Sequence, residues 1–195
     1  MRKLLTIVAL TLTINAVAQE HLTFNWIPID GTVEEMASRL VNSGFEDLTV
    51  LNDGKKATLS GTFLGVENCE ITLLGSPKTK TCFSVIVRTK PYGRDLNGLL
   101  NFEYYPFKKS LSEKYATAMT PPLYKEVVWT DKLNNSDDIS QALKDGIIEF
   151  ISLFNRPNGF IKLIIKPVTS SYLADNYTEI GFVDKVNYAI FEEEK

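Results

Sequence analysis

Apolar residues recur with helical spacing or alternate with polar residues along most of the chain, and turn residues separate these segments. Between Thr32 and Gly44 one helical stripe is apolar, formed by Val33, Met36, Ala37, Leu40 and Val41. Thr32 and Glu35 make a capping box at its start, and Gly44 suits a left-handed end. The pattern therefore predicts a helix here. Before it, alternation of Leu22, Phe24 and Trp26 with polar residues predicts a half-buried strand.

Strands and tight turns follow this helix. Asn52-Asp53-Gly54 separates strand-like residues 48–51 from 56–64, which is a strong hairpin signal. A second hairpin is predicted from residues 69–74 and 82–88. From residue 95 a helical stripe returns, formed by Leu100, Tyr104, Phe107, Leu111 and Tyr115. Pro106 lies inside this stripe and predicts a kink or a restart of the helix.

The second half repeats this order of elements. It contains a predicted strand at 126–130, a helix after Asp138, a hairpin of 150–154 with 160–165, a strand at 179–183 and a charged tail. Helix followed by antiparallel strands, twice over, predicts an α+β fold whose antiparallel sheet has helices packed on one face. The pattern leaves open whether two similar halves arose by duplication. Thr120-Pro121-Pro122 marks a seam near residues 117–123 within one domain, 19–195.

The N-terminus has the features of an export signal. Arg2 and Lys3 precede an apolar run, and Ala16-Val17-Ala18 offers small residues for cleavage after residue 18. The run is shorter than the roughly 20 residues that span a bilayer, and no cysteine follows it as a lipid acceptor. Residues 1–18 are therefore predicted to be a signal peptide, and the mature protein is expected to be periplasmic or secreted.

The net charge of the chain limits the classes of partner that are expected. The chain has a net charge of −3, and loss of the two basic residues of the signal makes it −5. Without a basic cluster, nucleic acid is not an expected partner, and no later segment is apolar enough to span a membrane.

Strand alternation places Cys69 and Cys82 on opposite faces of their hairpin, so free thiols are expected in place of a disulfide.

No residue combination in the sequence indicates a catalytic or cofactor site. The chain has one histidine and lacks zinc-protease, phosphate-loop, serine-hydrolase and dithiol motifs. After cleavage His21 would be the third residue of the mature chain. The N-terminal amine, two backbone amides and the imidazole of a third-position histidine can bind Cu(II). Cyclisation of an N-terminal Gln19, however, removes the amine. Capping of a helix explains residues 134–138 better than a calcium loop, and Glu34 and Glu35 point apart on their helix. No cofactor and no metal are therefore expected.

Aromatic residues in the central third are the remaining candidates for a site. Exposed tyrosine and tryptophan are typical of protein-recognition surfaces. Tyr92 lies beside a glycine and Tyr105 lies off the predicted apolar stripe, so both are expected to be exposed. Tyr124 and Trp129 complete the set of candidate binding residues.

The central helix resembles a pattern of uncharacterised exported proteins of gut Bacteroidetes. The residues that match it are Tyr104, Phe107, Lys108, Leu111, Lys114 and Tyr115, whereas Ala116 stands where the pattern has glycine. The opening residues 26–32, leading to Gly44-Phe45, are similar to the start of the same group, which implies no activity. The order of elements is also similar, by analogy of fold, to β-lactamase inhibitor proteins and to small lipoproteins of the outer-membrane assembly machine, although the lipid-acceptor cysteine of the latter is missing.

The sequence favours a non-catalytic exported protein that binds a macromolecule or an envelope component through its sheet or its aromatic loops. The alternatives are a hydrolase that uses Asp, Glu or Tyr without histidine, and a structural protein of the envelope. A pocket where two carboxyl groups with raised pKa values converge would indicate the hydrolase.

Overall fold

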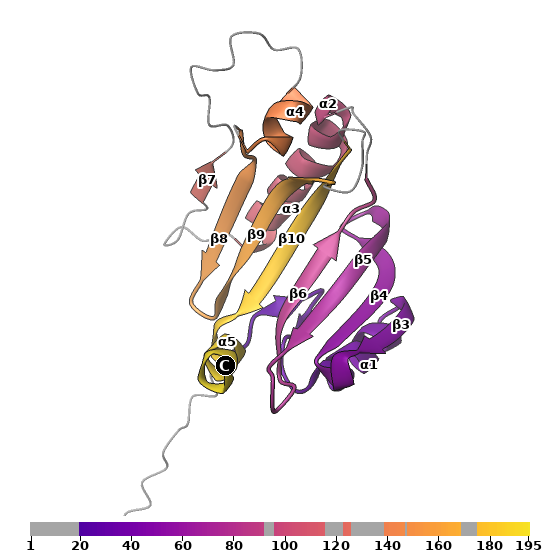
Figure 1. Cartoon of the computed structure of the whole chain (residues 1–195), viewed down its shortest axis with the longest axis vertical. Coiled ribbons are helices and arrows are strands. Elements are labelled where there is room, and N and C mark those ends of the chain that lie inside the picture. Colours follow the sequence, from indigo (N-terminus) through magenta and orange to yellow (C-terminus); the bar gives the residue numbers. More distant parts are fainter. Residues whose placement is uncertain (1–19, 92–95, 116–122, 126–138, 147, 169–174) are drawn as a thin grey trace, which may run out of the picture.

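The computed structural model describes residues 20–91, 96–115, 123–125, 139–146, 148–168 and 175–195. Eight strands form one antiparallel sheet in the order β3-β4-β5-β6-β10-β9-β8-β7 (Figure 1). They are β3 (Glu46–Leu51), β4 (Lys56–Phe63), β5 (Val66–Gly75), β6 (Cys82–Arg88), β7 (Leu123–Lys125), β8 (Ile151–Arg156), β9 (Gly159–Pro167) and β10 (Asn176–Asp184). Two meanders, β3–β6 and β7–β10, meet where β6 pairs with β10. The predicted α+β fold with an antiparallel sheet is confirmed.

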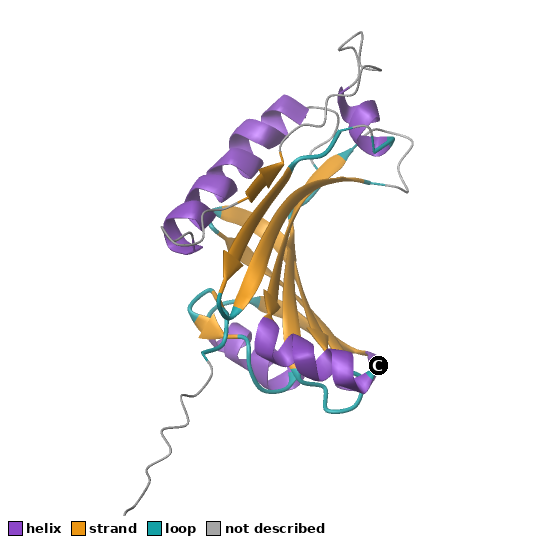
Figure 2. Ribbon diagram, turned by 90° about the vertical axis from the view of Figure 1, so that its left-hand side faces the viewer, coloured by secondary structure: helices purple, strands orange, loops and turns teal. Residues whose placement is uncertain are grey.

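Helices cover one face of this sheet, also as predicted. The sheet is curved, and the longer helices lie against its convex face while the concave face stays open (Figure 2). The helices are α1 (Val33–Asn42), α2 (Leu96–Leu99), α3 (Tyr105–Tyr115), α4 (Ile139–Lys144) and α5 (Lys185–Glu194). Each meander follows a helix, α1 before β3 and α3 before β7, and short α4 lies at one end of the sheet (Figure 1).

The hydrophobic core fills the space between the convex face and the helices. Side chains alternate between the faces of a strand, so alternate residues of the central strands enter this core, whereas all residues of the edge strand β3 are exposed. One fully buried row across the centre of the sheet contains Leu73, Val85, Phe182 and Ile161. The core is continuous across both meanders. Residues 117–122 of the predicted seam lie outside the described ranges.

Helix α1 forms as the sequence predicts. The Thr32 hydroxyl accepts a hydrogen bond from the Glu35 amide at 3.3 Å, and the Glu35 carboxylate accepts one from the Thr32 amide at 2.7 Å. Gly44 has the expected left-handed φ of 99°. The predicted stripe is buried except for Val41, which is 41% exposed at the edge of the helix.

The segment before α1 corrects one prediction. Leu22 and Phe24 are buried, but Trp26 is 78% exposed and does not continue their strand. The chain reverses at Asn25 and Trp26, and a short hairpin forms from β1 (Thr23–Phe24) and β2 (Ile27–Pro28). Both turn residues have positive φ, 47° and 68°, as in a type I′ turn. The alternation of apolar residues missed this turn because tryptophan is rarely found in such a conformation.

The hairpins of the first half form as predicted, and both thiols are buried and free. Cys82 pairs with Gly75, whereas Cys69 lies six residues farther along β5. At a rise of about 3.3 Å per residue the two cysteines are roughly 20 Å apart along the hairpin. A disulfide requires Cα atoms within about 7 Å, so this separation along the strands excludes the bond whichever faces the thiols occupy.

The central helix is irregular just before Pro106. A π-helical turn, Leu100–Tyr104, joins α2 to α3 without a break, and Pro106 is the second residue of α3. The helix therefore changes its hydrogen-bonding pattern next to Pro106, whose missing N–H a regular helix interior does not tolerate. The predicted stripe is buried at Tyr104, Phe107, Leu111 and Tyr115. The π-turn also places Glu103 inside the protein, with 7% of its surface exposed.

The second half differs from prediction at its C-terminal end. The strand predicted at 126–130 lies outside the described residues, and the short strand β7, Leu123–Lys125, lies just before that range at the sheet edge. The predicted charged tail is the helix α5, which packs on β6 through Phe83 and Phe191, with ring centroids 4.4 Å apart. This contact joins residues more than one hundred positions apart, so local sequence could not indicate it. The hairpin of β8 and β9 is confirmed.

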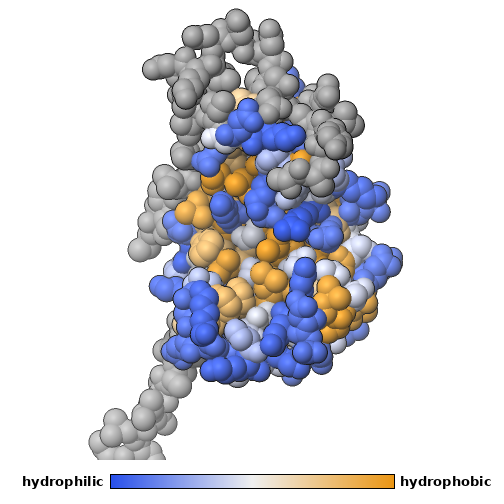
Figure 3. All heavy atoms as spheres, viewed as in Figure 1, coloured by the Kyte–Doolittle hydropathy of each residue, from blue (hydrophilic) through white to orange (hydrophobic). Residues whose placement is uncertain are grey.

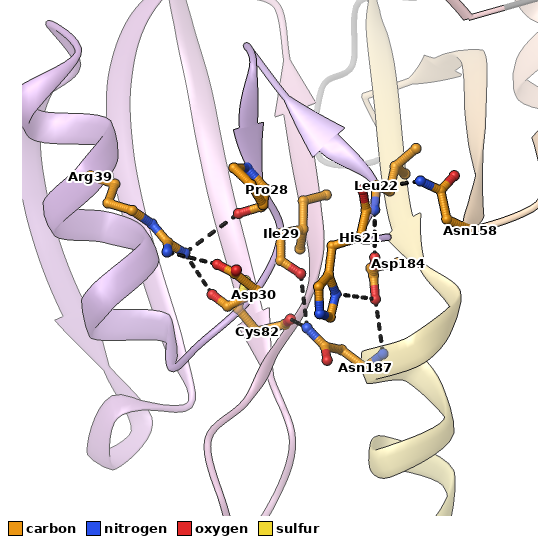
Figure 4. Close-up of polar contacts among 10 residues, drawn as sticks. All are labelled: His21, Leu22, Pro28, Ile29, Asp30, Arg39, Cys82, Asn158, Asp184 and Asn187. Atoms are coloured by element: carbon orange, nitrogen blue, oxygen red, sulfur yellow. Dashed lines mark hydrogen bonds and ion pairs between the residues drawn. The ribbon is translucent and has the colours of Figure 1, made fainter. Parts of the chain in front are cut away.

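Asp184 joins the start of the described chain to α5. Its buried carboxylate caps α5 by accepting the Asn187 amide at 2.9 Å, and it accepts the Leu22 amide at 2.6 Å (Figure 4). His21 Nδ1 lies 3.2 Å from the same carboxylate. The Asn187 side chain donates to the carbonyl groups of Ile29 and Cys82, both at 2.8 Å. These contacts hold the N-terminal segment against β10 and α5.

Among the residues that the structure describes, no helix has both the length and the apolar character needed to cross a membrane.

Candidate functional site

The concave face of the sheet is not covered by the longer helices, which lie on the convex side (Figure 2). Figures 1 and 3 look onto it, and apolar side chains gather on it in patches separated by polar ones (Figure 3). Strand pairing sets three rows across this face: Glu70, Arg88, Glu179, Ile164 and Ile151; Thr72, Ile86, Gly181, Lys162 and Leu153; and Leu74, Ser84, Val183, Phe160 and Asn155. We call these rows the open face. Phe160 is 38% exposed, and the other apolar members are half-buried.

A network of ion pairs lies at the centre of the first row. Arg88 Nε donates to Glu179 Oε2 at 2.8 Å, and Lys166 Nζ lies 2.7 Å from Glu179 Oε1. Glu70 is 3.7 Å from the Arg88 guanidinium on the other side. Glu179 of β10 is therefore held between two cations, Arg88 of β6 and Lys166 of β9. These contacts fix the side chains where the two meanders meet.

This network sets the protonation of its members. Burial raises the pKa of Glu179, but hydrogen bonds from Lys166 and Arg88 outweigh it and leave that pKa below its ordinary value. The hydrogen bond with Glu179 likewise raises the pKa of Arg88. Both groups are charged at neutral pH, so the network acts as a fixed charge pattern.

A shallow hollow of about 460 Å³ adjoins the network at one end of the open face. It is lined by Asn68, Glu70, Arg88, Thr89, Lys90, Pro91, Val168 and Tyr177. Among the described residues, its lining combines two cations with one tyrosine and one carboxylate, that of Glu70. This composition suits polar contact with a partner and lacks the paired acids of a glycoside hydrolase.

Lys162 lies in the apolar part of the open face. It pairs across the sheet with Gly181 and Leu153, and Phe160 and Ile164 flank it on its own strand. Lys162 forms no ion pair with any residue in the described ranges. An unpaired ammonium group surrounded by half-exposed aliphatic side chains is a potential anchor for a carboxylate of a partner.

The candidate residues from the sequence do not gather on this face. Tyr105 is 42% exposed as predicted, but it lies on α3, on the convex side. Tyr124 belongs to β7, where its backbone pairs with Ser152, and its side chain is outside the described set, as are Tyr92 and Trp129. His21 contacts Asp184 through Nδ1, and Gln19, which the copper hypothesis requires, is not described.

The two thiols are buried and protonated. Burial raises the pKa of Cys69 to about 11 and that of Cys82 to about 12, so neither thiol is ionised at neutral pH. Only a thiolate is an effective nucleophile. Within the described part of the chain, no group of three or more His, Cys, Asp and Glu residues is placed to hold a metal ion.

Glu103 is a buried acid on the convex side. Burial raises its pKa, and a hydrogen bond with Thr89 acts in the opposite direction. Its Oε2 atom has no hydrogen-bond partner among the described residues. Glu103 lines none of the described hollows, so it affects folding more directly than binding.

Replacing Glu103 with glutamine should change the pH dependence of stability. Because the folded pKa is raised, the folded state binds this proton more tightly than the unfolded state, and stability is lost as pH rises above the ordinary value of 4.5. Glu103→Gln removes this loss, so its stability relative to wild type should increase as the pH rises above 4.5. Urea unfolding across this range measures the effect, and Glu67→Gln, at an exposed position, is the control. Parallel pH profiles of wild type and Glu103→Gln would contradict the prediction.

Sequence reasoning missed the residues of the open face, although a signal for them was present. Arg88, Lys162 and Lys166 occupy the polar positions of alternating strands, which indicates one exposed side of each strand. The alternation does not show that β6 pairs with β10, and this pairing brings Arg88 and Lys166 to the same carboxylate.

Comparisons with known proteins leave the geometry of the open face as the basis for function. No protein-family model, no curated protein and no solved structure matches this chain. The resemblance to exported proteins of Bacteroidetes and the analogy with β-lactamase inhibitor proteins therefore stay predictions.

Proposed function

We propose that this is an exported, non-catalytic protein that binds another protein on its open face. The observation that carries the proposal is the concave face itself, on which half-exposed apolar side chains extend across several strands and over whose centre none of the described helices lies (Figures 2 and 3). Contiguous apolar patches rimmed by polar residues are typical of protein interaction sites. The predicted signal peptide, residues 1–18, would bring the protein to the periplasm or the exterior.

The charges of the open face favour a partner with an acidic group on its contact surface. Lys162 is unpaired among the described residues and lies in the apolar part, while Arg88 and Lys166 are already paired with Glu179. A partner carboxylate that reaches Lys162 would be surrounded by Phe160, Leu153 and Ile164. An ion pair in such a partly dry surface contributes to specificity and to the rate of association.

Site-specific photo-crosslinking tests whether a partner protein contacts the open face or the surface of α5. Phe160 on the open face and Tyr188 on α5 are both aromatic and both 38% exposed, so they form a matched pair. A photoreactive phenylalanine at position 160 should capture a protein from envelope extract, whereas the same residue at position 188 should not. The captured protein must then bind the purified chain directly. Equal capture from both positions, or capture from position 188 alone, would refute the open face as the site.

Reversing the charge of Lys162 should weaken this interaction. Lys162→Glu places a carboxylate opposite the expected acidic group, and we expect a loss of about 2 kcal/mol, roughly 30-fold in Kd. Lys109→Glu, at an exposed position of α3, is the control with the same charge change. Calorimetric titration with the crosslinked partner measures both variants. Equal affinities for the two variants would show that Lys162 does not contact the partner.

The structure gives the hydrolase alternative less support. A general acid requires a raised pKa, whereas that of Glu179 is lowered by its cations. Glu103, whose pKa is raised, faces the convex side and lines none of the described hollows. The carboxyl groups in the described ranges therefore give no support for a pair of acids with opposite roles in one pocket.

A further inference from the structure

Trp26 combines strong exposure with a strained backbone. It is 78% exposed at the tip of the β1–β2 hairpin, and its φ of 68° is one that L-residues rarely adopt. The second position of a type I′ turn strongly favours glycine, so Asn25-Gly would form this hairpin with less strain. Strained, exposed residues of this kind are concentrated at binding sites. Stability does not explain a tryptophan here.

One cation lies over this ring, and a second lines the same hollow. The ammonium group of Lys114 lies 4.0 Å from the centre of the Trp26 ring, and burial lowers the pKa of that lysine. Arg156 donates from Nη1 to the Tyr115 carbonyl at 3.0 Å, which fixes its guanidinium at the end of α3. Neither cation forms an ion pair with any residue in the part of the chain that the structure describes.

These groups line one hollow. It measures about 150 Å³ and is lined by Glu20, His21, Leu22, Thr23, Trp26, Lys114, Tyr115, Arg156 and Asn158. A second hollow of about 250 Å³ shares Glu20, Arg156 and Asn158 with it. Because α3 and the hairpin lie on the convex side, the hollow is separate from the open face.

We propose that this hollow binds an acidic sugar unit of a glycan. The indole face of Trp26 that Lys114 does not cover is a flat apolar platform for the C–H face of a sugar ring, and Lys114 and Arg156 supply the positive charge for its carboxylate. The backbone and side-chain groups of His21, Thr23 and Asn158 form a polar rim for hydroxyl groups. Small-ligand sites have this composition, an apolar surface with a few fixed polar groups.

The platform favours a sugar over an acidic peptide. A sugar ring has one flat apolar face and a polar edge, which match the indole and the rim. The side chains of Asp and Glu have no such face, so they would pair with the cations and leave Trp26 exposed. Binding by this hollow is independent of the function proposed for the open face, because the two sites share no lining residue.

Nuclear magnetic resonance of the tryptophan side chains tests the proposal. The chain has two tryptophans, so two indole N–H signals are expected, and Trp26→Phe assigns them. Titration with a galacturonic acid trimer should shift the Trp26 signal and not the other. The neutral galactose trimer and a triglutamate peptide, the two comparison ligands, should have much weaker effects. No shift with the acidic trimer would overturn the proposal, as would an equal shift with either comparison ligand.

Two kinds of variant separate binding from folding. Lys114→Gln and Arg156→Gln should each weaken binding of the acidic trimer by about tenfold or more, since each removes a charge-assisted contact. Trp26→Gly should abolish binding without lowering the melting temperature, because it relieves the strained turn. Undiminished binding by Trp26→Gly would overturn the proposal, and a lowered melting temperature would refute the strain on which it rests.

Discussion

Replacing Asp184 with alanine is expected to lower the free energy of unfolding by about 3 kcal/mol. Its carboxylate caps α5 at the Asn187 amide, and loss of such a cap costs about 1 kcal/mol. It also accepts the Leu22 amide at 2.6 Å, and leaving that buried donor without a partner costs roughly 2 kcal/mol more. The side chain is fully buried, so water cannot replace these contacts in the remaining structure.

Chemical denaturation of the purified protein measures this effect, and Thr32→Ala is the matched control. Thr32 caps α1 through the Glu35 amide, but that contact is exposed to solvent. Its loss should cost only about 1 kcal/mol. If Asp184→Ala is no more destabilising than Thr32→Ala, Asp184 does not hold the N-terminal segment to the sheet as described.

The elements that the sequence predicts well are those that local interactions determine. Helix α1 forms from its capping box and apolar stripe, both contained within thirteen residues. The β3–β4 and β5–β6 hairpins pair residues on either side of a short turn. In each case the residues that decide the structure are neighbours in sequence, so periodicity and turn chemistry are sufficient.

The C-terminal helix shows why other elements escape such reasoning. Residues 192–194 are three consecutive glutamates, and the sequence there favours a solvated tail. The helix forms because Asp184 caps it and because Phe191 stacks on Phe83 of the distant strand β6. Tertiary contact therefore overrides the local pattern, as is common for helices whose intrinsic stability is low.

The candidate sites are harder still to predict, because they depend on how the two meanders meet. Arg88 and Lys166 converge on Glu179 only when β10 is inserted between β6 and β9. Trp26 becomes exposed only because the chain reverses at Asn25, a turn whose second residue is unusual. The candidate residues are predicted from the tendency of tyrosine and tryptophan to lie in recognition surfaces. Which residues a partner can reach depends instead on their exposure and on their position across the strands.

The second large effect is expected at Gly159, where β9 begins. A Cβ atom at this position would collide with the carbonyl oxygen of Val183 on β10, and it would come within 3.2 Å of the Leu22 side chain. The obstructing atom belongs to the backbone of a paired strand, so it cannot move aside without disturbing the contacts of the adjacent Asp184. Gly159→Ala should therefore cost about 3 kcal/mol, at the upper end of what overpacking costs.

Gly181→Ala provides the contrast that makes this result interpretable. Gly181 lies in the middle of β10 on the open face, and no atom lies within 4 Å of a Cβ placed there. Its replacement should change the free energy of unfolding by no more than about 0.5 kcal/mol. Urea unfolding of both variants measures the same substitution at two positions of one sheet. If β9 and β10 tolerated alanine poorly in general, both variants would lose the same free energy of unfolding. A large loss at Gly159 alone would instead locate the constraint where β9, β10 and the N-terminal segment converge, and equal losses would contradict the close approach of these three segments.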